Sequence, residues 1–589
     1  MAQVDTRIPD GRRTRQFSLV GLSILAIVIG IVTGLGAIAL RYLIGIFTNL
    51  FFLGRVSADY DAHLPVPPSP FGPFIILAPV IGGLIVLFLI RRHAPEVRGS
   101  GVPDVMDAIF YRDGRIRPAV VLIKSLASAL SLGSGASAGR EGPIIQIGGG
   151  IGSILGQVYN LRRWQVITMV AAGAGAGIAA SFNTPLGAVL FAVEVLLPEF
   201  SPRTLIPVVL ATGTATYMGR LAFGIEPLYQ VVSHQRPDLA VPVSADMLPL
   251  FIFLGLFCGL AAAGFIRAIF ETEELFERVP LNPYVKNALG MTVVGGIMYA
   301  LMLTTGLYHS AGVGDASVQQ VLNGQIAAPL LLLVLFAMKL LATAISLGVG
   351  ASGGVFGPSL YLGAMLGGAF GAALDLMFPS LGFDAVIFAM IGMAAMMGAG
   401  TGAALSSIIM IFEMTGDYTI TMGAIIAVVV GVGVRRSILP DTLFTIRLTR
   451  RGHRIPTENR SHLFPLRRAG ELMEPVVAVI AEADLSPHAV VVHRPGGKRS
   501  FAVVTRGRHI AGVVPVDAND PRHTFGAVVG PVGVVRESTF LQTAMTHMAD
   551  RGQVALVVMK DGHPPRAENV VGVITRVAIG GAVIEDYRS

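Results

Sequence analysis

The stretch Gly139-Arg140-Glu141-Gly142-Pro143, which stands directly before the apolar run Ile144–Leu155, decides the fold. Proline fits the first turn of a helix, and glycine lets the preceding backbone turn tightly. Two segments of the same kind are Gly99-Ser100-Gly101-Val102-Pro103 and Gly354-Val355-Phe356-Gly357-Pro358. Helix N-termini carry unpaired N–H groups and a partial positive charge. Several such ends aimed at one point would coordinate a dehydrated anion without a full positive charge.

The composition places most of the chain in lipid. Hydrophobic residues make up 53% of it and charged residues only 14%, against about 25% charged residues in ordinary soluble domains. The first apolar run, from Phe17 to about Leu43, is much longer than the roughly 7–15 residues of a signal-peptide core, so we expect a retained helix. The single cysteine, Cys258, excludes an intramolecular disulfide and a cysteine-based metal cluster.

Basic residues gather at the edges of the apolar segments, where Lys and Arg usually mark the cytoplasmic side. They are Arg12, Arg13, Arg15, Arg91, Arg92, Arg435, Arg436, Arg447, Arg450 and Arg451. For a net charge of +7, this placement favours a topology signal over a nucleic-acid partner. We expect an integral protein of the plasma (inner) membrane, with the N-terminus and everything after Arg451 in the cytoplasm.

Apolar segments of two kinds fill the region from 17 to 451. Long ones, such as Ile75–Ile90, Leu248–Phe270 and Leu330–Leu347, suit a span of about 30 Å of hydrocarbon. Shorter ones are interrupted by glycine: Ile144–Leu155, Val166–Ala180 and Pro185–Leu197. These predict broken helices, because irregular backbone at membrane depth persists only inside protein or beside a wet cavity.

Three pairs of similar segments predict an internal repeat. The pairs are Gly99–Asp104 with Gly312–Asp315, Gly133–Pro143 with Gly348–Pro358, and Pro185–Glu194 with Ala404–Glu413. Each pair is separated by slightly over 210 residues (358 − 143 is 215). Paired halves with interrupted helices put a substrate site at the repeat interface. The expected fold of this region is therefore an all-α polytopic membrane protein of two inverted repeats.

Two polar side chains stand within the glycine segments. Ser100 would add a hydroxyl donor to an anion site, and its alternative is an ordinary capped turn. Glu141 is a carboxylate at membrane depth, where such a residue is costly and functional by default. At a helix N-terminus Glu141 can fill the anion site itself until protonation or the anion displaces it. That behaviour would make Glu141 a gate.

The segments GSGVP, GREGP and GGVFGP, in this order and spacing, resemble the signatures of the CLC family of chloride channels and chloride/proton antiporters. Phe182–Glu194 and Phe412–Tyr418 fit the same family, and the resemblance covers about Val20 to Arg451. It implies a homodimer with one pore per subunit and a gate at Glu141. The implied anion-binding residues are Ser100, Gly101, Val355 and Phe356, and the implied pore-supporting residues are Lys124, Gly139, Arg140, Gly142, Pro143, Gly354 and Pro358.

Two positions depart from the family's pattern. Antiporters typically carry an internal glutamate directly after the position that matches Glu194, and here that residue is Val195, which cannot carry a proton. We interpret Glu194 itself as structural. The family's pore tyrosine aligns with Phe444, whose missing hydroxyl removes roughly 0.5–1.5 kcal/mol of anion binding. We therefore expect a passive chloride channel gated by protonation of Glu141, with a weakly coupled chloride/proton antiporter as the alternative.

The expected domains are a cytoplasmic segment (1–16), the pore domain (17–451), a linker (452–465) and a small cytoplasmic α/β domain (466–589). A helical pattern at Phe540–Ala549 and six β-branched runs predict the last of these: Val476–Ile480, Ala489–Val492, Phe501–Val504, Val513–Val516, Val554–Met559 and Val570–Ile574. Ala469–Met473 and Gly572–Thr575 resemble a pair of CBS modules, about Leu466–Asp517 and Gly526–Asp586. Such pairs can bind adenine nucleotides. No acidic residue follows Ile574-Thr575, where nucleotide-binding members commonly carry one, which favours a structural role.

Other function classes fit less well. A CBS-containing cation transporter needs clustered intramembrane carboxylates, whereas Glu141, Glu194 and Glu413 are scattered. A fluoride exporter would depart from the serine and GREGP patterns. No HExxH, GxSxG or P-loop motif indicates an enzyme. The expected partners are chloride, the lipid bilayer and, in the antiporter interpretation, protons. We expect no metal site and no required cofactor.

Overall fold

The computed structural model describes residues 15–97, 99–197, 201–231, 247–453, 468–481, 500–506, 509–516, 532–539 and 541–581. The chain divides into two compact units, Met1–Pro456 and Thr457–Ser589. Their boundary lies inside the linker that the sequence predicts at 452–465.

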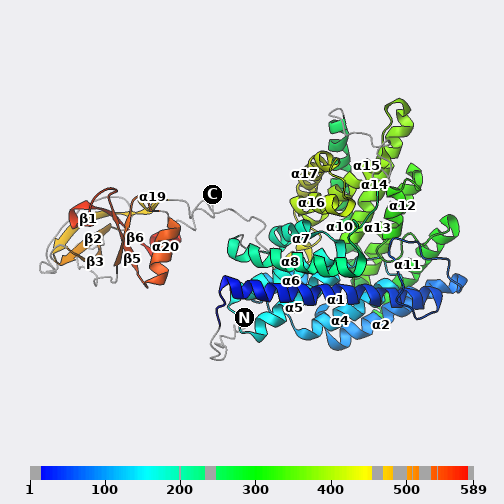
Figure 1. Cartoon of the computed structure of the whole chain (residues 1–589), viewed down its shortest axis with the longest axis horizontal. Helices are drawn as coiled ribbons and strands as arrows, with labels where there is room; N and C mark the ends of the chain where they lie inside the picture. The colour runs from blue at the N-terminus through cyan, green and yellow to red at the C-terminus, as the bar shows by residue number, and fades with distance from the viewer. Residues whose placement is uncertain are drawn as a thin grey trace. The chain divides into compact units, whose positions relative to one another are not determined.

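The first unit is helical throughout its described part, which confirms the all-helical membrane fold (Figure 1). A first run holds α1 (Leu19–Leu53), α2 (Leu77–His93), α3 (Val102–Tyr111), α4 (Pro118–Gly133), α5 (Glu141–Val158), α6 (Arg163–Phe182), α7 (Pro185–Phe191) and α8 (Pro202–Phe223). A second run holds α10 (Leu248–Arg278), α11 (Pro283–Thr305), α12 (Asp315–Leu322), α13 (Pro329–Gly348), α14 (Phe356–Met377), α15 (Ala385–Thr401), α16 (Ala404–Thr415) and α17 (Thr421–Ile438), before the short α18 (Thr445–Arg450).

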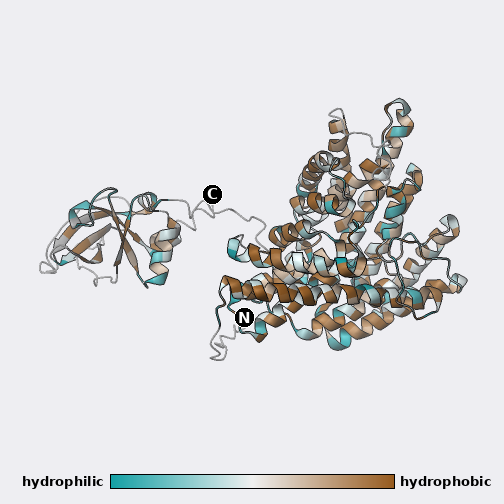
Figure 2. Ribbon diagram, viewed as in Figure 1, coloured by the Kyte–Doolittle hydropathy of each residue, from teal (hydrophilic) through white to brown (hydrophobic). Residues whose placement is uncertain are grey.

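Hydrophobic residues extend along most of these helices (Figure 2). Their large apolar side chains are both buried and exposed, as Ile29 and Ile24 of α1 illustrate. Within the described residues, eight helices are long and apolar enough to cross a membrane. Four shorter apolar segments accompany them, among them α4 and α16. Long and short helices therefore coexist, as the two kinds of apolar segment predict.

Hydrogen bonds in reciprocal pairs relate the two runs by an approximate two-fold axis. The hydroxyls of Ser128 and Ser352 lie 2.9 Å apart, and those of Ser137 and Thr343, their mates 215 residues along the chain, also lie 2.9 Å apart. At the centre, the Gly139 N–H donates to the Gly354 carbonyl at 2.7 Å, and the Gly354 N–H donates back at 2.6 Å. The sequence repeat is thus a structural repeat whose axis passes between Gly139 and Gly354.

Glycine has two different roles in the segments that the sequence predicts to be broken. The prediction is wrong for Ile144–Leu155 and Val166–Ala180, which lie inside the uninterrupted helices α5 and α6. A Cβ atom on Gly173 would lie 2.1 Å from the Gly148 carbonyl oxygen of α5, and one on Gly148 would lie 2.1 Å from the Gly173 oxygen. Glycine here permits close packing of two helices. Pro185–Leu197 is interrupted as predicted, because α7 passes into the π-helical turn Ala192–Leu196.

Glu194 of the first repeat caps a helix of the second repeat, and Glu413 of the second repeat caps a helix of the first. The Glu194 carboxylate, in the turn after α7, accepts hydrogen bonds from the backbone N–H groups of Leu405 at 3.0 Å and Ser406 at 2.8 Å, at the start of α16. The Glu413 carboxylate of α16 accepts from Leu186 at 3.0 Å and Gly187 at 2.8 Å, at the start of α7. Each acid satisfies N–H groups that a helix N-terminus leaves unpaired. The two acids therefore lock α7 and α16 together.

The second unit contains one six-stranded sheet of order β3-β2-β1-β6-β5-β4. Its elements are α19 (Ala469–Leu472), β1 (Glu474–Ala481), β2 (Ser500–Arg506), β3 (His509–Val516), β4 (Val532–Arg536), α20 (Leu541–Asp550), β5 (Ala555–Met559) and β6 (Val570–Thr575). Each half pairs its first two strands in parallel and its last two antiparallel. The sequence analysis missed β4, and the predicted run Ala489–Val492 lies outside the described residues.

Removing either reciprocal cap should destabilise the membrane unit. We expect Glu194→Ala and Glu413→Ala each to lower the free energy of unfolding by about 0.5–2 kcal/mol, because each leaves two N–H groups at a helix start without their acceptor. Unfolding of the full chain in detergent measures the change. The control is Glu271→Ala, which removes an exposed carboxylate of α10. Equal stability of all three variants would show that the caps do not stabilise the fold.

Candidate anion site

Three glycine segments that are far apart in sequence meet at the centre of the membrane unit. A Cβ atom on Gly142 would lie 1.8 Å from the Ser100 carbonyl oxygen and 3.0 Å from Gly354 Cα, so all three backbones touch there. Gly101 directly precedes α3 and has a φ of +87°, which side-chain-bearing residues rarely adopt. The starts of α3, α5 and α14 therefore converge. Their unpaired N–H groups make this point suited to an anion.

The Glu141 side chain already occupies part of this point. Glu141 is 1% exposed, and its carboxylate folds back between Gly139 and Gly357. A Cβ atom on Gly139 would lie 1.9 Å from Oε2, and one on Gly357 would lie 2.7 Å from Oε1. The nearest donors are the backbone N–H groups of Glu141 itself and of Gly357, and no described group completes a hydrogen bond of full geometry to either oxygen. The carboxylate thus sits at the N-terminal end of α14, loosely held.

A small cavity lies on the other side of Gly354. Ser100 and Val355 line it together with Gly99, Pro103, Ile269, Phe270, Leu347, Leu443 and Arg447. Phe444 stands next to Leu443 at the start of α18 and is 1% exposed, but its ring packs edge-on against Phe191 at 6.0 Å between centroids. The ring of Phe356 packs against Phe182 at 5.7 Å. The structure therefore brings Ser100 and Val355 to one cavity and places the two phenylalanine rings in the core beside it.

Arg447 brings a cation to this cavity that the sequence analysis assigned only to topology. Its guanidinium donates to both carboxylate oxygens of Glu273, at 3.0 and 3.1 Å, and reaches the backbone of Gly99. Its position one helical turn after Phe444 is the signal that could have placed it at the site.

Two buried lysines donate hydrogen bonds to the loops that precede the short helices α3 and α12. Lys124 Nζ donates to the carbonyls of Val97 at 3.1 Å and Gly99 at 2.6 Å, directly before Ser100. Lys339 Nζ makes the same pair of bonds to Ser310 at 3.2 Å and Gly312 at 2.7 Å. Each lysine thereby joins two carbonyls of the loop that precedes α3 or α12. The sequence analysis missed Lys339, although it follows Lys124 by 215 residues.

Arg140 joins the gate segment to the second repeat. Its guanidinium lies 3.4 Å from the Asp315 carboxylate, and both side chains are buried. The Tyr229 hydroxyl donates to the other Asp315 oxygen at 3.0 Å, and the guanidinium stacks over Phe182 at 5.4 Å. Asp315, the last residue of the Gly312–Asp315 repeat segment, thereby offsets the charge of Arg140. The neighbouring Glu141 is left as the acid without a paired cation.

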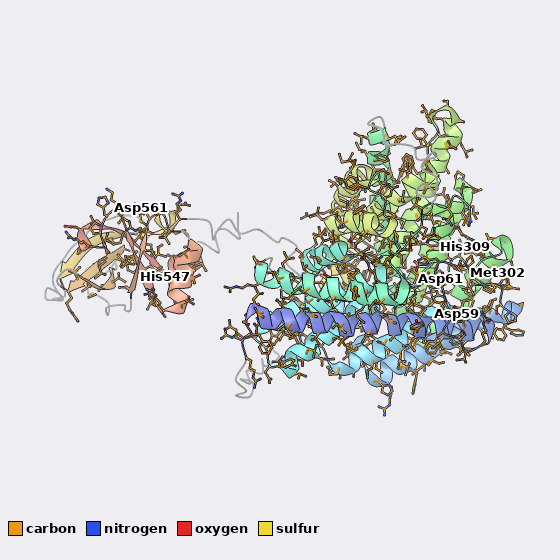
Figure 3. The ribbon with its side chains drawn as sticks, in the orientation of Figure 1. Asp59, Asp61, Met302, His309, His547 and Asp561 are labelled. Atoms are coloured by element: carbon orange, nitrogen blue, oxygen red, sulfur yellow. The ribbon has the colours of Figure 1, made fainter. Side chains whose placement is uncertain are left out.

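A cavity of about 550 Å³ is lined by Phe182, Arg41, Asp61, His63 and Arg220, among other residues. Figure 3 labels Asp61, in the loop after α1, and His309, in the loop after α11. Burial lowers the pKa of His63 below its ordinary value, because desolvation outweighs the attraction of Asp315. The imidazole is therefore neutral at neutral pH, and acidification adds a positive charge to the cavity wall.

Positions 195 and 194 hold an apolar side chain and a carboxylate that caps a helix. Val195 is an apolar, partly buried residue packed against the core, and the Glu194 carboxylate is taken up by the cap of α16. Pro143 and Pro358 lie in the first turns of α5 and α14. The arrangement as a whole is a set of helix N-termini around one buried carboxylate, inside an apolar helical protein, and it is that of a membrane protein with a candidate anion site.

Comparisons with known proteins place this chain in a family. Residues 82–436 match the family described as voltage gated chloride channel. Two curated relatives are the H(+)/Cl(-) exchange transporters ClcA of Salmonella paratyphi B and Salmonella newport, each 31% identical over 426 residues, which cover 70% of this chain and 86% of the relative. The chain therefore belongs to the voltage-gated chloride channel (CLC) family, which confirms the resemblance.

Two solved structures share the fold. The X-ray crystal structure of a slow cyanobacterial Cl−/H+ antiporter is 27% identical and covers 74% of this chain and 99% of that one, with a TM-score of 0.63. The crystal structure of a eukaryotic CLC transporter is 20% identical, with a TM-score of 0.59, and covers 95% of this chain and 98% of that one. The second likeness, which shows the fold alone, extends into the C-terminal unit.

Displacing the Glu141 carboxylate should free the helix N-terminus for chloride. In Gly139→Ala the new Cβ atom would collide with Oε2 of the competing carboxylate, so we expect chloride to bind about tenfold more tightly, a difference of about 1.4 kcal/mol. Titration calorimetry of the purified chain measures it. In a Glu141→Ala background the same change should have no effect, and Gly264→Ala, at a glycine with open space around it, is the control. Unchanged affinity in Gly139→Ala would contradict this placement.

Proposed function

We propose that this protein exchanges chloride for protons across a membrane, with Glu141 alternating between a bound carboxylate and a protonated side chain. The observation that supports it most is the seat of the Glu141 carboxylate at the N-terminal end of α14, where the backbone donors suit an anion. Because the carboxylate and chloride compete for the same place, the movement of chloride is coupled to the protonation of Glu141. Chloride enters when the carboxylate leaves, and the carboxylate leaves more readily as a neutral acid.

The exchange follows from the charges around Glu141. As a carboxylate, the side chain blocks the path and lies against the N-terminal end of α14, whose partial positive charge attracts it. A proton removes the negative charge, so the attraction to the helix N-terminus weakens and chloride takes the place. Loss of the proton restores competition and expels chloride. Ser100 and Val355 hold the anion on the far side of Gly354, in the small cavity that they share.

The relatives support exchange over the passive channel that we expected from the sequence. The curated relatives are named exchange transporters, and the 27% identical structure is titled an antiporter. Val195 cannot bind a proton, and Glu194 is committed to α16. In the proposal, protons therefore reach Glu141 without a second, proton-carrying glutamate at position 194 or 195.

A passive chloride channel is the second candidate. The observation that favours it is the fully apolar pair Val195 and Phe444, since neither side chain can bind a proton or donate to an anion. A cation transporter receives no support, because no group of three or more His, Cys, Asp or Glu lies together within the described part of the chain.

The second unit fits a structural role. Its two halves repeat one strand topology, and we propose that they form a CBS pair. The Thr575 hydroxyl lies 3.3 Å from the Glu474 carboxylate, to which it donates, and accepts from the Ala578 N–H at 3.0 Å. With its hydroxyl so engaged, Thr575 is poorly placed to hold an adenine nucleotide. We further propose a homodimer in the plasma (inner) membrane with both termini in the cytoplasm.

Proton movement driven by chloride separates exchange from passive conduction. In liposomes loaded with chloride and diluted into low chloride, we expect the wild-type chain to drive proton uptake as chloride leaves. Glu141→Gln should carry chloride without protons, since an amide cannot exchange a proton at these pH values. Glu271→Gln, an exposed position of α10, should keep both fluxes. Chloride efflux from the wild type without proton uptake would establish the passive channel instead.

A further inference from the structure

A second cavity lies apart from the anion path, where α2 ends and α11 begins. Its volume is about 420 Å³. The last turns of α2 and α10, the first turn of α11 and the turn Gly348–Gly350 form its walls. Leu87, Ile90, Phe276 and Pro283 make much of this wall apolar. An apolar wall contributes nothing to the binding of a small hydrated ion, so the cavity suits a ligand with an apolar part.

Two cations face the same cavity. Arg91 comes from the last turn of α2 and Lys286 from the first turns of α11. Arg91 lies 5.9 Å from the centroid of the Tyr284 ring, and Lys286 Nζ donates to the main-chain carbonyl of Glu277 at 3.3 Å. Neither cation forms an ion pair with a carboxylate of the described residues, although Glu277 also lines the cavity. The net charge of the lining is positive.

The cavity continues into surfaces that face lipid. α2 and α11 pack against each other, and both carry large apolar side chains that the protein leaves uncovered: Leu77, Ile81, Ile85 and Phe88 on α2, and Val285, Leu289 and Val293 on α11. A ligand whose head lies between Arg91 and Lys286 could therefore extend its chains along these helices. Basic pockets between membrane helices are typical sites for anionic lipid headgroups.

We propose that this cavity binds an anionic phospholipid, with its phosphate between Arg91 and Lys286 and its acyl chains along α2 and α11. The bound lipid contacts the turn Gly348–Gly350, which leads in four residues to Gly354 and the anion site. Asn287 of α11 donates to the Val349 carbonyl of this turn at 3.0 Å. Lipid at the start of α11 therefore holds the turn that precedes Val355. This site is independent of whether the anion path exchanges protons.

Lipid binding to the full chain tests the proposal without measuring transport. The purified protein in detergent is titrated with phosphatidylglycerol and, separately, with phosphatidylcholine of the same acyl chains, and bound lipid is counted by native mass spectrometry. We expect phosphatidylglycerol to bind more tightly. Arg91→Gln and Lys286→Gln should each weaken it by about fivefold, and the double variant by about 25-fold.

Matched variants separate this site from general charge effects. Arg92→Gln removes the neighbouring arginine, which does not line the cavity, and should leave binding unchanged. The pair Arg91→Lys and Lys286→Arg keeps both charges and should retain binding, which excludes misfolding as the cause of a loss. Equal binding of the two lipids, equal loss in Arg92→Gln, or displacement of the lipid by inorganic phosphate alone would each overturn the proposal.

Discussion

The pair of hydrogen bonds between Gly139 and Gly354 is the contact on which the rest of the membrane unit depends. It closes the two repeats onto each other at their two-fold axis. Only glycine is small enough here, since a Cβ atom on either residue would collide with the Glu141 carboxylate or its backbone surroundings. Because α5 and α14 begin two residues after this contact, their N-termini are delivered to the same point. An anion site then needs no charged ligand.

The two repeats share the hydrogen bonds that support their helices and differ at the first residue of α5 and of α14. Lys124 and Lys339 make the same two bonds, and Glu194 and Glu413 make the same caps. In contrast, Glu141 of the first repeat corresponds to Phe356 of the second at the offset of 215 residues. One helix start therefore supplies a carboxylate, and the other supplies N–H groups with an apolar side chain that cannot compete for them. In the proposed function, this asymmetry makes one helix end the gate and the other the place where the gate binds.

The sequence predicted most of the site, because each glycine motif demands a particular backbone conformation. Three motifs located the convergence around Ser100, Glu141 and Val355, and the repeat offset predicted the two-fold. The features that the sequence could not predict depend on contacts between residues far apart in the chain. The glycines of Val166–Ala180 look like helix breaks, yet Gly173 serves close packing against Gly148. Lys339 and Asp315 look like isolated charges until the loop carbonyls and Arg140 are placed beside them.

The central claim is that the Glu141 carboxylate and an anion compete for the N-terminal end of α14. Bromide scatters anomalously, so crystals of the wild type and of Glu141→Ala grown in bromide would reveal where the anion lies. The account predicts an anomalous peak beside the Gly357 N–H in Glu141→Ala that is absent from the wild type when the carboxylate is seated there. A peak at that point in both proteins, or in neither, would contradict it.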